Sequence, residues 1–236
     1  MDQEMKVLCT ICARAGSKGV ANKNLRLING LPLIAYSLQQ AVESKLFAQI
    51  AVSSDSAEIR ETALAHGATF VIDRPAQMAS DTAPKVPAIR HCAETSEKEF
   101  GKFDIVVDLD ATAPLRIVAD IVGALNLLIA TDADNIITGT PAHRSPYFNL
   151  VETDSNGIVH LSKPLLESVS RRQDSPECFD MNASIYVWKR DALLNNQSLF
   201  APSTRLFVMP RARSFDIDDQ ADFEMVEWMM SKGATP

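Results

Sequence analysis

Short apolar runs rich in valine and isoleucine alternate with longer segments of helical period through the first half of the chain. This alternation is typical of repeated β-α-β units, in which helices cover both faces of a parallel sheet. The pattern predicts strands at residues 7–13, 50–53, 69–72, 105–109 and 135–140, and helices at 33–44, 57–66, 86–100 and 117–130. We therefore expect an α/β fold with a mainly parallel sheet.

The pattern changes after residue 140. Apolar runs at 148–151 and 158–161 flank Asp154-Ser155-Asn156-Gly157, a strong turn signal, and so predict a hairpin. A polar stretch from 168 to 180 follows, then strands at 184–188 and 206–209 and a final helix over residues 219–230. Because no repeat or low-complexity linker interrupts the chain, we expect one domain over 1–236, with 141–190 as a β-rich insertion suited to dimerisation.

Composition limits the classes of partner. Hydrophobic residues make up 46% of the 236 residues and charged residues 22%, which suits one large folded core. The formal net charge of −7 disfavours nucleic acid, so a bound polyanion must meet a local cluster of lysines and arginines. The acidic start, Met1-Asp2-Gln3-Glu4, does not resemble a secretory signal, and the apolar stretch 117–130 is too short to span a bilayer. We expect a cytoplasmic protein without membrane contact.

The cysteines and histidines do not predict a metal centre. Cys9 and Cys12 have CxxC spacing, but they lie in the apolar run 7–13, where strand residues three apart point to opposite faces. We interpret both as buried core residues. The four histidines are scattered along the chain, so a zinc site is not expected.

The segment after the first strand is the strongest candidate for ligand binding. It reads Ala13-Arg14-Ala15-Gly16-Ser17-Lys18-Gly19-Val20-Ala21-Asn22-Lys23-Asn24, with two glycines and three cations, Arg14, Lys18 and Lys23. Ligands bind beyond the carboxyl ends of strands in α/β sheets, and glycine lets backbone amides approach phosphate oxygens. The segment has neither P-loop nor dinucleotide-binding glycine spacing. It indicates a small phosphorylated ligand, although a solvated turn would have similar composition.

Two further segments carry acids. In an extended Ser214–Asp219 segment, Asp216 and Asp218 would face one side and could hold a hard cation such as Mg²⁺, with Phe215 and Ile217 toward the core. Asp218 or Asp219 could instead, or also, cap the last helix. Residues 108–116, where the fourth strand meets its helix, face the same crevice as the first loop and could bind sugar hydroxyls or support the metal. Alternatively, Asp108 is a buried, hydrogen-bonded strand residue.

Four ordered motifs together resemble the acylneuraminate cytidylyltransferases, the CMP-sialic acid synthetase family. They run along almost the whole chain: Ala13–Gly19 with Lys23-Asn24, Arg74-Pro75 with Ala79-Ser80-Asp81-Thr82, Pro114-Leu115-Arg116, and Asp216-Ile217-Asp218. The resemblance implies a Rossmann-like domain with a dimerisation insertion, acting as a homodimer. It also implies a Mg²⁺-dependent reaction of CTP with a nine-carbon 2-keto sugar acid, giving the CMP-sugar and pyrophosphate.

The resemblance also implies roles for single residues. It implies nucleotide binding by Ala13, Arg14, Ser17, Lys18, Lys23, Asn24, Arg74 and Ala83, catalysis by Lys23, Arg14 and Lys18, and metal binding by Asp216 and Asp218. Asp110 stands in the sugar crevice where many sialic acid enzymes have glutamine, and with His143–Phe148 it resembles the branch that acts on legionaminate-like sugars. Lys85 stands where a small hydroxyl residue is more usual.

The acceptor is an anion, so a cation should meet its carboxylate. Arg171 and Arg172 are candidates for this contact. If the insertion crosses a dimer interface, they could act in the site of the neighbouring subunit. Alternatively, they form a solvated basic turn. Two rival functions stay open at this point. One is transfer to an acceptor other than N-acetylneuraminate or a legionaminate-like sugar, such as an eight-carbon keto sugar or a sugar phosphate. The other is a regulatory module that binds CTP without turnover.

Overall fold

The computed structural model describes residues 5–16, 19–80, 82–165, 171–196 and 198–233. A seven-stranded sheet runs through the molecule in the order β11-β7-β10-β6-β1-β4-β5. All neighbouring strands are parallel except β10, which is antiparallel to both β6 and β7. The mainly parallel sheet is thus confirmed. The strands are β1 (Val7–Cys12), β4 (Gln49–Ser54), β5 (Phe70–Asp73), β6 (Ile105–Leu109), β7 (Asn135–Pro141), β10 (Phe179–Lys189) and β11 (Arg205–Val208).

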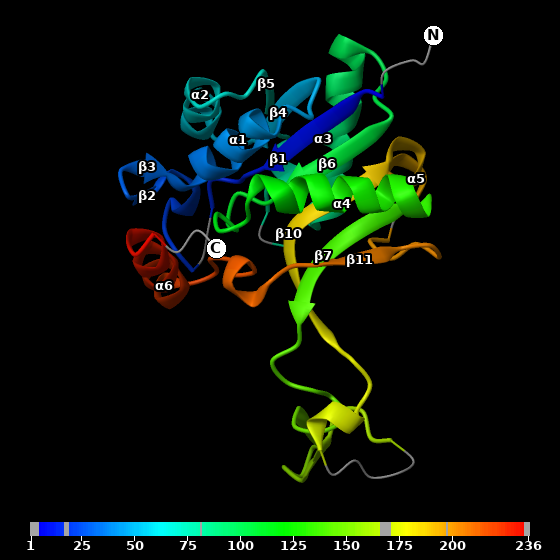
Figure 1. The fold of residues 1–236 in the computed structure, drawn as a ribbon. Helices are drawn as coiled ribbons and strands as arrows, with labels where there is room; N and C mark the ends of the chain where they lie inside the picture. The colour runs from blue at the N-terminus through cyan, green and yellow to red at the C-terminus, as the bar shows by residue number, and fades with distance from the viewer. Residues whose placement is uncertain (1–4, 17–18, 81, 166–170, 197, 234–236) are drawn as a thin grey trace.

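Helices cover both faces of the sheet (Figure 1). One buried core lies under α1 (Leu33–Ser44), α2 (Ala57–Ala65) and α4 (Val118–Thr131). A second lies on the opposite face, under α3 (Lys85–Phe100) and α5 (Arg190–Asn195). Burial on both faces explains why the central strands are continuously apolar instead of alternating.

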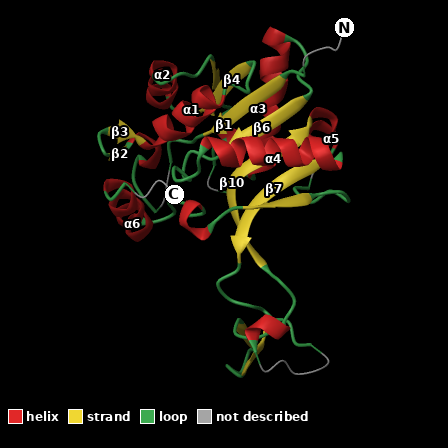
Figure 2. Cartoon of the chain, in the orientation of Figure 1, coloured by secondary structure: helices red, strands yellow, loops and turns green. Residues whose placement is uncertain are grey.

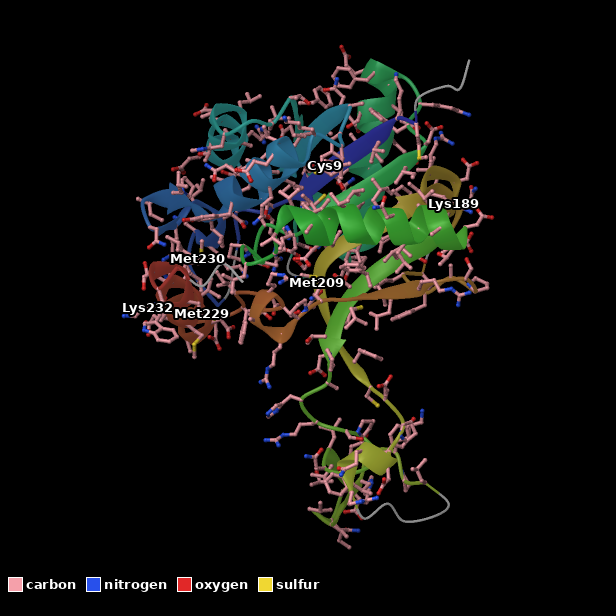
Figure 3. All side chains as sticks on the ribbon, in the orientation of Figure 1. Cys9, Lys189, Met209, Met229, Met230 and Lys232 are labelled. Atoms are coloured by element: carbon pink, nitrogen blue, oxygen red, sulfur yellow. The ribbon has the colours of Figure 1, made fainter. Side chains whose placement is uncertain are left out.

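The two cysteines of β1 face opposite cores, as expected. Cys9 is fully buried in the first core, in the middle of the sheet (Figure 3), and Cys12 borders the second. The interpretation of both as core residues is wrong for Cys12, which is half-buried and lines a cavity at the end of the strand. The strand ends there, so its last side chain packs against the second core and also faces the cavity.

The last helix forms a small third cluster with the loop after β1. Apolar side chains of α6 (Gln220–Ser231) pack against Ile28, Leu33 and Ile217. Met229 and Met230 lie at the end of this helix, near the C-terminus (Figure 3). Ile28 belongs to a short hairpin, β2 (Leu27–Ile28) and β3 (Leu31–Pro32), which leads into α1. The cluster joins the C-terminal segment to the start of the chain.

Residues 142–165 and 171–178 leave the sheet and project from the body (Figure 2). They contain one small hairpin, β8 (Val151–Thr153) and β9 (Val159–Leu161), closed by the expected turn, in which the Asp154 carboxylate accepts hydrogen bonds from the amides of Asn156 and Ile158. The strand expected at 148–151 begins only at residue 151. Residues 148–150 instead fold back, and all three amides donate to the Ser145 carbonyl.

The strand expected at 184–188 is the second half of a longer one. β10 starts at Phe179, pairs there with Pro141 of β7, and continues between β6 and β7. Its residues therefore belong to the sheet, although they fall within the range 141–190. Within the described residues, no helix is long and apolar enough to cross a membrane.

Candidate active site

A cavity of about 360 Å³ opens at the carboxyl ends of β1 and β6. Three separate parts of the chain line it: the loop after β1, the segment leading into α3, and the residues after β6, with Asp218 at the rim. A cavity in this position is the usual ligand site of an α/β sheet. Sequence-predicted residues in its lining are Ala13, Arg14, Lys23, Asn24, Arg74, Ala83, Asp110 and Asp218.

Backbone hydrogen bonds fix the loop after β1. The amide of Ala13 donates to the Ser53 carbonyl over 3.1 Å, and the amide of Ala15 to an Asp55 carboxylate oxygen over 2.9 Å. Asn24 is buried, and its amide nitrogen donates to the Arg14 carbonyl, while its Oδ1 has no hydrogen-bond partner among the described residues. A buried acceptor without a partner is costly, so it favours a ligand that donates a hydrogen bond here.

The predicted loop residues Ser17 and Lys18 lie outside the described residues. The same loop meets the C-terminal acidic segment at two points. The Lys23 ammonium donates a hydrogen bond to the Ile217 carbonyl and lies 3.9 Å from an Asp218 carboxylate oxygen. Gly19 is so close that a Cβ atom there would lie 1.9 Å from the Asp218 carbonyl oxygen. Only glycine fits at this position, and the cationic loop and the acidic segment therefore form one wall of the cavity.

Arg74 and Ala83 lie on the opposite wall, before α3. Arg74 is buried, and its guanidinium donates to both the hydroxyl and the carbonyl of Ser53, at the end of β4. These bonds fix the orientation of a planar cation beside the cavity. A fixed planar donor group suits recognition of a planar polar ligand such as a nucleobase.

Asp216 and Asp218 lie on either side of buried Ile217, and Phe215 also packs on the core, as the extended pattern predicts. Asp218 lines the main cavity, whereas Asp216 lines a second cavity of about 180 Å³. Burial, followed by the charge of Asp218, raises the pKa of Asp216. The disfavoured charge of Asp216, next to a second carboxylate, fits a divalent cation, which would compensate both charges.

The capping role falls to the neighbouring residue. Asp219 accepts a hydrogen bond from the Asp222 amide at the start of α6, and the Asp222 carboxylate accepts from the amides of Asp218 and Asp219. Both carboxylates of the predicted metal pair are therefore left free of the cap. Among the described residues, no group of three or more His, Cys, Asp or Glu side chains has the geometry of a metal centre, so further ligands would come from substrate or water.

The end of β6 carries a compact charge cluster. The Lys85 ammonium lies 2.7 Å from Asp110 Oδ2 and 3.1 Å from Asp108 Oδ2, and the other Asp110 oxygen accepts from the amide and hydroxyl of Thr112. Burial lowers the pKa of Lys85, but the two carboxylates outweigh it and the net pKa is raised. Burial opposes ionisation of Asp110 too, yet Lys85 and Thr112 hold its pKa well below the usual range.

Asp108 has the structural role that the sequence left open for it. It is fully buried and accepts a hydrogen bond from the Thr10 hydroxyl on β1. Burial raises its pKa, and the neighbouring Asp110 adds to the rise against the pull of Lys85. Asp108 is thus a buried structural residue that supports the cluster from beneath the cavity. Lys85 and Asp110 line the cavity itself.

Arg171 does not line this cavity within the described part of one chain. Arg171 is exposed in the projecting segment, where it pairs with Asp174 at 2.8 Å. The side chain of residue 172 lies outside the described residues. Their assignment to an acceptor site stays a prediction that needs a second subunit.

Sequence reasoning missed the part that Lys85 plays. A signal for it was present, because Lys85 is the first residue of α3, and a cation at a helix N-terminus is disfavoured by the helix dipole. A lysine in that position is stabilised by an acidic partner from elsewhere in the chain. The partner, Asp110, is 25 residues away in sequence, so the pairing could not be deduced without the fold.

Comparisons with known proteins show the family and the fold. A family model described as cytidylyltransferase matches residues 8–227. Two relatives are 48% identical to the chain over 96% of its length: the post-translational flagellin modification protein B of Campylobacter coli and the CMP-N,N'-diacetyllegionaminic acid synthase of Campylobacter jejuni, covered over 96% and 95% of their lengths. A solved CMP:2-keto-3-deoxy-manno-octonic acid synthetase complexed with CTP has a similar fold, with a TM-score of 0.72, 18% identity and coverage of 97% and 99%.

Proposed function

Because the chain belongs to the cytidylyltransferase family, we propose that it transfers CMP from CTP to the anomeric hydroxyl of a nine-carbon 2-keto sugar acid, releasing pyrophosphate. The observation that carries the proposal is the contact between the cationic loop and the acidic segment, through Lys23, Gly19 and Asp218, at the rim of one cavity. The relative named as a CMP-N,N'-diacetyllegionaminic acid synthase favours a legionaminate-like acceptor.

The reaction is an in-line displacement at the α-phosphorus. The oxygen of the anomeric C2 hydroxyl forms the new bond to phosphorus, its proton is lost to solvent, and the bond to the β-phosphate oxygen breaks. Arg14, Lys18 and Lys23 bind the triphosphate and stabilise the charge that grows on the leaving pyrophosphate. Arg74 and Ala83 contact the cytosine. The unpartnered Asn24 Oδ1 is a further buried hydrogen-bond acceptor for the nucleotide.

Asp216 and Asp218 would hold a Mg²⁺ ion. The fit rests on their oxygen donors and on the raised pKa of Asp216, which results first from burial and then from the charge of Asp218. When bound, the ion supplies positive charge to phosphate oxygens of the nucleotide. The reaction would take place in the cytoplasm, where a CTP-dependent enzyme meets its nucleotide.

We further propose that residues 142–178 mediate a homodimer in which Arg171 and Arg172 reach the acceptor site of the neighbouring subunit. Exposed apolar side chains gather on the insertion and support an interface there: Phe148, Leu150, Val151, Ile158 and Val159. Ile158→Asp should shift the mass measured by light scattering from dimer to monomer. A monomeric unaltered protein would contradict the proposal.

The proposed function is tested by pyrophosphate release from CTP and Mg²⁺ with a panel of nine-carbon and eight-carbon keto acids. We expect release with an N-acylated nine-carbon acid, and none with Asp216→Ala under the same conditions. If pyrophosphate is released only with an eight-carbon acid, the nine-carbon acceptor is wrong and the eight-carbon acid takes its place. If calorimetry shows CTP binding but no acceptor gives pyrophosphate release, the protein is better explained as a regulatory module.

A further inference from the structure

The second cavity, of about 180 Å³, lies where the insertion leaves the sheet, and we call it the Asp216 cavity. Three parts of the chain line it: the end of β7, the start of β10, and the segment from Arg211 to Asp216. Thr140 of β7 and Asp180 of β10, which are paired neighbours in the sheet, belong to the first two parts. The proposed metal site uses only Asp216, so the other polar groups of this cavity have no assigned role.

The Asp216 cavity lies close to the main cavity. Ile217 separates Asp216 from Asp218, and its amide donates over 2.9 Å to the carbonyl of Thr112, which lines the main cavity. Residues two apart in an extended segment are only roughly 7 Å apart along the chain. Because one acid of the pair lines each cavity, two reactants bound in the two cavities would come together at this pair.

The reaction needs room for two reactants. The main cavity, of about 360 Å³, is near the lower end of the range for a site that holds one small molecule. Its lining includes Arg14 and Lys23, proposed for the triphosphate, and Arg74, proposed for the cytosine. The nucleotide therefore occupies much of this space, and part of the acceptor needs further room at the acidic pair.

Arg211 brings an unmatched positive charge to the Asp216 cavity. Among the described residues its guanidinium makes no hydrogen bond or ion pair, whereas the guanidinium of Arg213 is bound at two points by Asp120. The turn that carries Arg211 is fixed, because the Pro210 carbonyl accepts hydrogen bonds from the Arg213 amide and the Ser214 hydroxyl. A fixed turn thus carries a free planar donor group at the cavity.

Two acids also line the Asp216 cavity, and neither uses the charge of Arg211. Asp216 would be compensated by the divalent cation, and Asp180 is exposed, with its Oδ2 accepting a hydrogen bond from the His143 amide over 2.9 Å. The Thr140 hydroxyl is buried and has no hydrogen-bond partner in the described part of the chain. A free cation and an unpartnered hydroxyl in one cavity favour a ligand with negatively charged oxygens.

The carboxylate of a 2-keto sugar acid is bonded to the same carbon that carries the attacking hydroxyl, so it has to bind beside the reacting centre. We propose that the Asp216 cavity receives this carboxylate, with the Arg211 guanidinium of the same subunit as its partner. The planar fork of an arginine matches the two carboxylate oxygens. Arg171 and Arg172 of a neighbouring subunit are then left to other groups of the sugar. This inference rests on the proposed function, since it assumes a sugar acid as acceptor.

The test compares a sugar acid with its methyl ester, using the acid of the panel that gives the fastest pyrophosphate release. Arg211→Met should lower the ratio of kcat/KM for the acid to kcat/KM for the ester about tenfold or more, since hydrogen bonds between charged groups contribute this much. The intrinsic reactivities of the two sugars cancel, because both proteins meet the same pair. The KM for CTP should stay within about twofold, because Arg211 does not line the main cavity.

Three further variants sharpen the comparison. Arg205→Met removes an exposed arginine from β11 and should leave the ratio unaltered. Arg211→Lys keeps the charge without the fork and should retain more of the ratio than Arg211→Met. Arg171→Met tests the rival partner, and a ratio that falls in this variant but not in Arg211→Met would overturn the inference. Thermal unfolding of each variant checks that it folds.

The outcomes distinguish this inference from the proposed function. If Arg211→Met lowers kcat/KM equally for acid and ester, or raises only the KM for CTP, the inference is overturned and the function stands. If the ester gives no release, the same ratio is taken from dissociation constants measured by calorimetry. If no acid of the panel gives release, the function is overturned. Calorimetry with N-acetylneuraminic acid and its methyl ester, with CTP and Mg²⁺ present, then decides the inference: tighter binding of the acid that is lost in Arg211→Met supports it, and equal binding, or binding of neither sugar, overturns it.

Discussion

Arg213 and Asp120 form a two-point ion pair, with the guanidinium Nε and Nη2 each 2.9 Å from a carboxylate oxygen. Asp120 lies in the first turn of α4, and Arg213 precedes Asp216 and Asp218 by a few residues. The pair therefore anchors the acidic segment to a helix that packs on the sheet. Because the Asp120 side chain is only 3% exposed, water replaces little of the interaction if it is broken.

Asp120→Ala should destabilise the protein by about 3 kcal/mol, because it leaves the largely buried guanidinium of Arg213 without its partner and removes the acceptor of the Ile117 amide. The measurement is the free energy of unfolding from denaturant titration. Arg211→Met, which removes an exposed arginine two residues before Arg213, is the matched control and should change stability by less than about 0.5 kcal/mol. Equal effects of the two substitutions would show that the ion pair does not anchor this segment.

Gly19→Ala should lower pyrophosphate release by about tenfold or more while the protein stays folded. The added methyl group would meet the Asp218 carbonyl at 1.9 Å, so either the loop or the acidic segment must move. Small misplacements of catalytic groups have costs of this order. Gly16→Ala adds the same group where nothing lies within 4 Å, so it should have a much smaller effect on the initial rate. Similar rates for the two variants would refute the close-contact argument.

Lys23→Ala should reduce turnover about 100-fold, as is typical for loss of a preorganised charge donor at the reacting centre. Steady-state kinetics with saturating CTP measures the change, and thermal unfolding checks that the variant folds. Lys102→Ala, an exposed lysine after α3, controls for the loss of one positive charge. A turnover number for Lys23→Ala close to that of the unaltered protein would remove Lys23 from the catalytic group.

Asp216 should make the metal-free protein less stable at neutral pH. Its pKa is raised by burial and by Asp218, so in the window above the ordinary aspartate pKa the folded state holds more protons than the unfolded state. The contribution of Asp216 to the free energy of unfolding therefore falls as the pH rises from the ordinary aspartate pKa to the raised pKa, and it is lowest above the raised pKa. Asp216→Asn should raise the melting temperature at pH 7 in EDTA, and the gain should shrink toward about pH 3.9.

Metal addition provides the second half of that test. Mg²⁺ should raise the melting temperature of the unaltered protein, because a ligand that binds the folded state stabilises it, and it should not do so for Asp216→Asn. Identical responses of the two proteins to Mg²⁺ would exclude Asp216 as a metal ligand.

The sequence predicts the parallel sheet well because its central strands are buried on both faces and read as continuous apolar runs. It predicts the direction of β10 less well, since an apolar run does not record whether its neighbours run parallel or antiparallel. The hairpin of β2 and β3 was missed although Asn29-Gly30 is a strong turn signal, with positive φ at both residues, because strands of two residues carry no periodicity.

The same distinction holds for the candidate site: groups of neighbouring residues could be predicted, and contacts between distant segments could not. Residues close together in sequence, such as the loop from Ala13 to Asn24 or the pair Asp216 and Asp218, were predicted as groups. Contacts between distant segments could not be predicted from one sequence. The contact of Gly19 with Asp218, and that of Lys85 with Asp110, depend on how the loops cross above the sheet.

The insertion begins and ends at residues that lie side by side, since Pro141 of β7 pairs with Phe179 of β10. A segment with adjacent ends can be lengthened or exchanged at an entropic cost that grows only with the logarithm of its length. Neither change would disturb the strands that shape the cavity. The architecture therefore allows the insertion to change in length or sequence while the strand ends that line the cavity keep their positions.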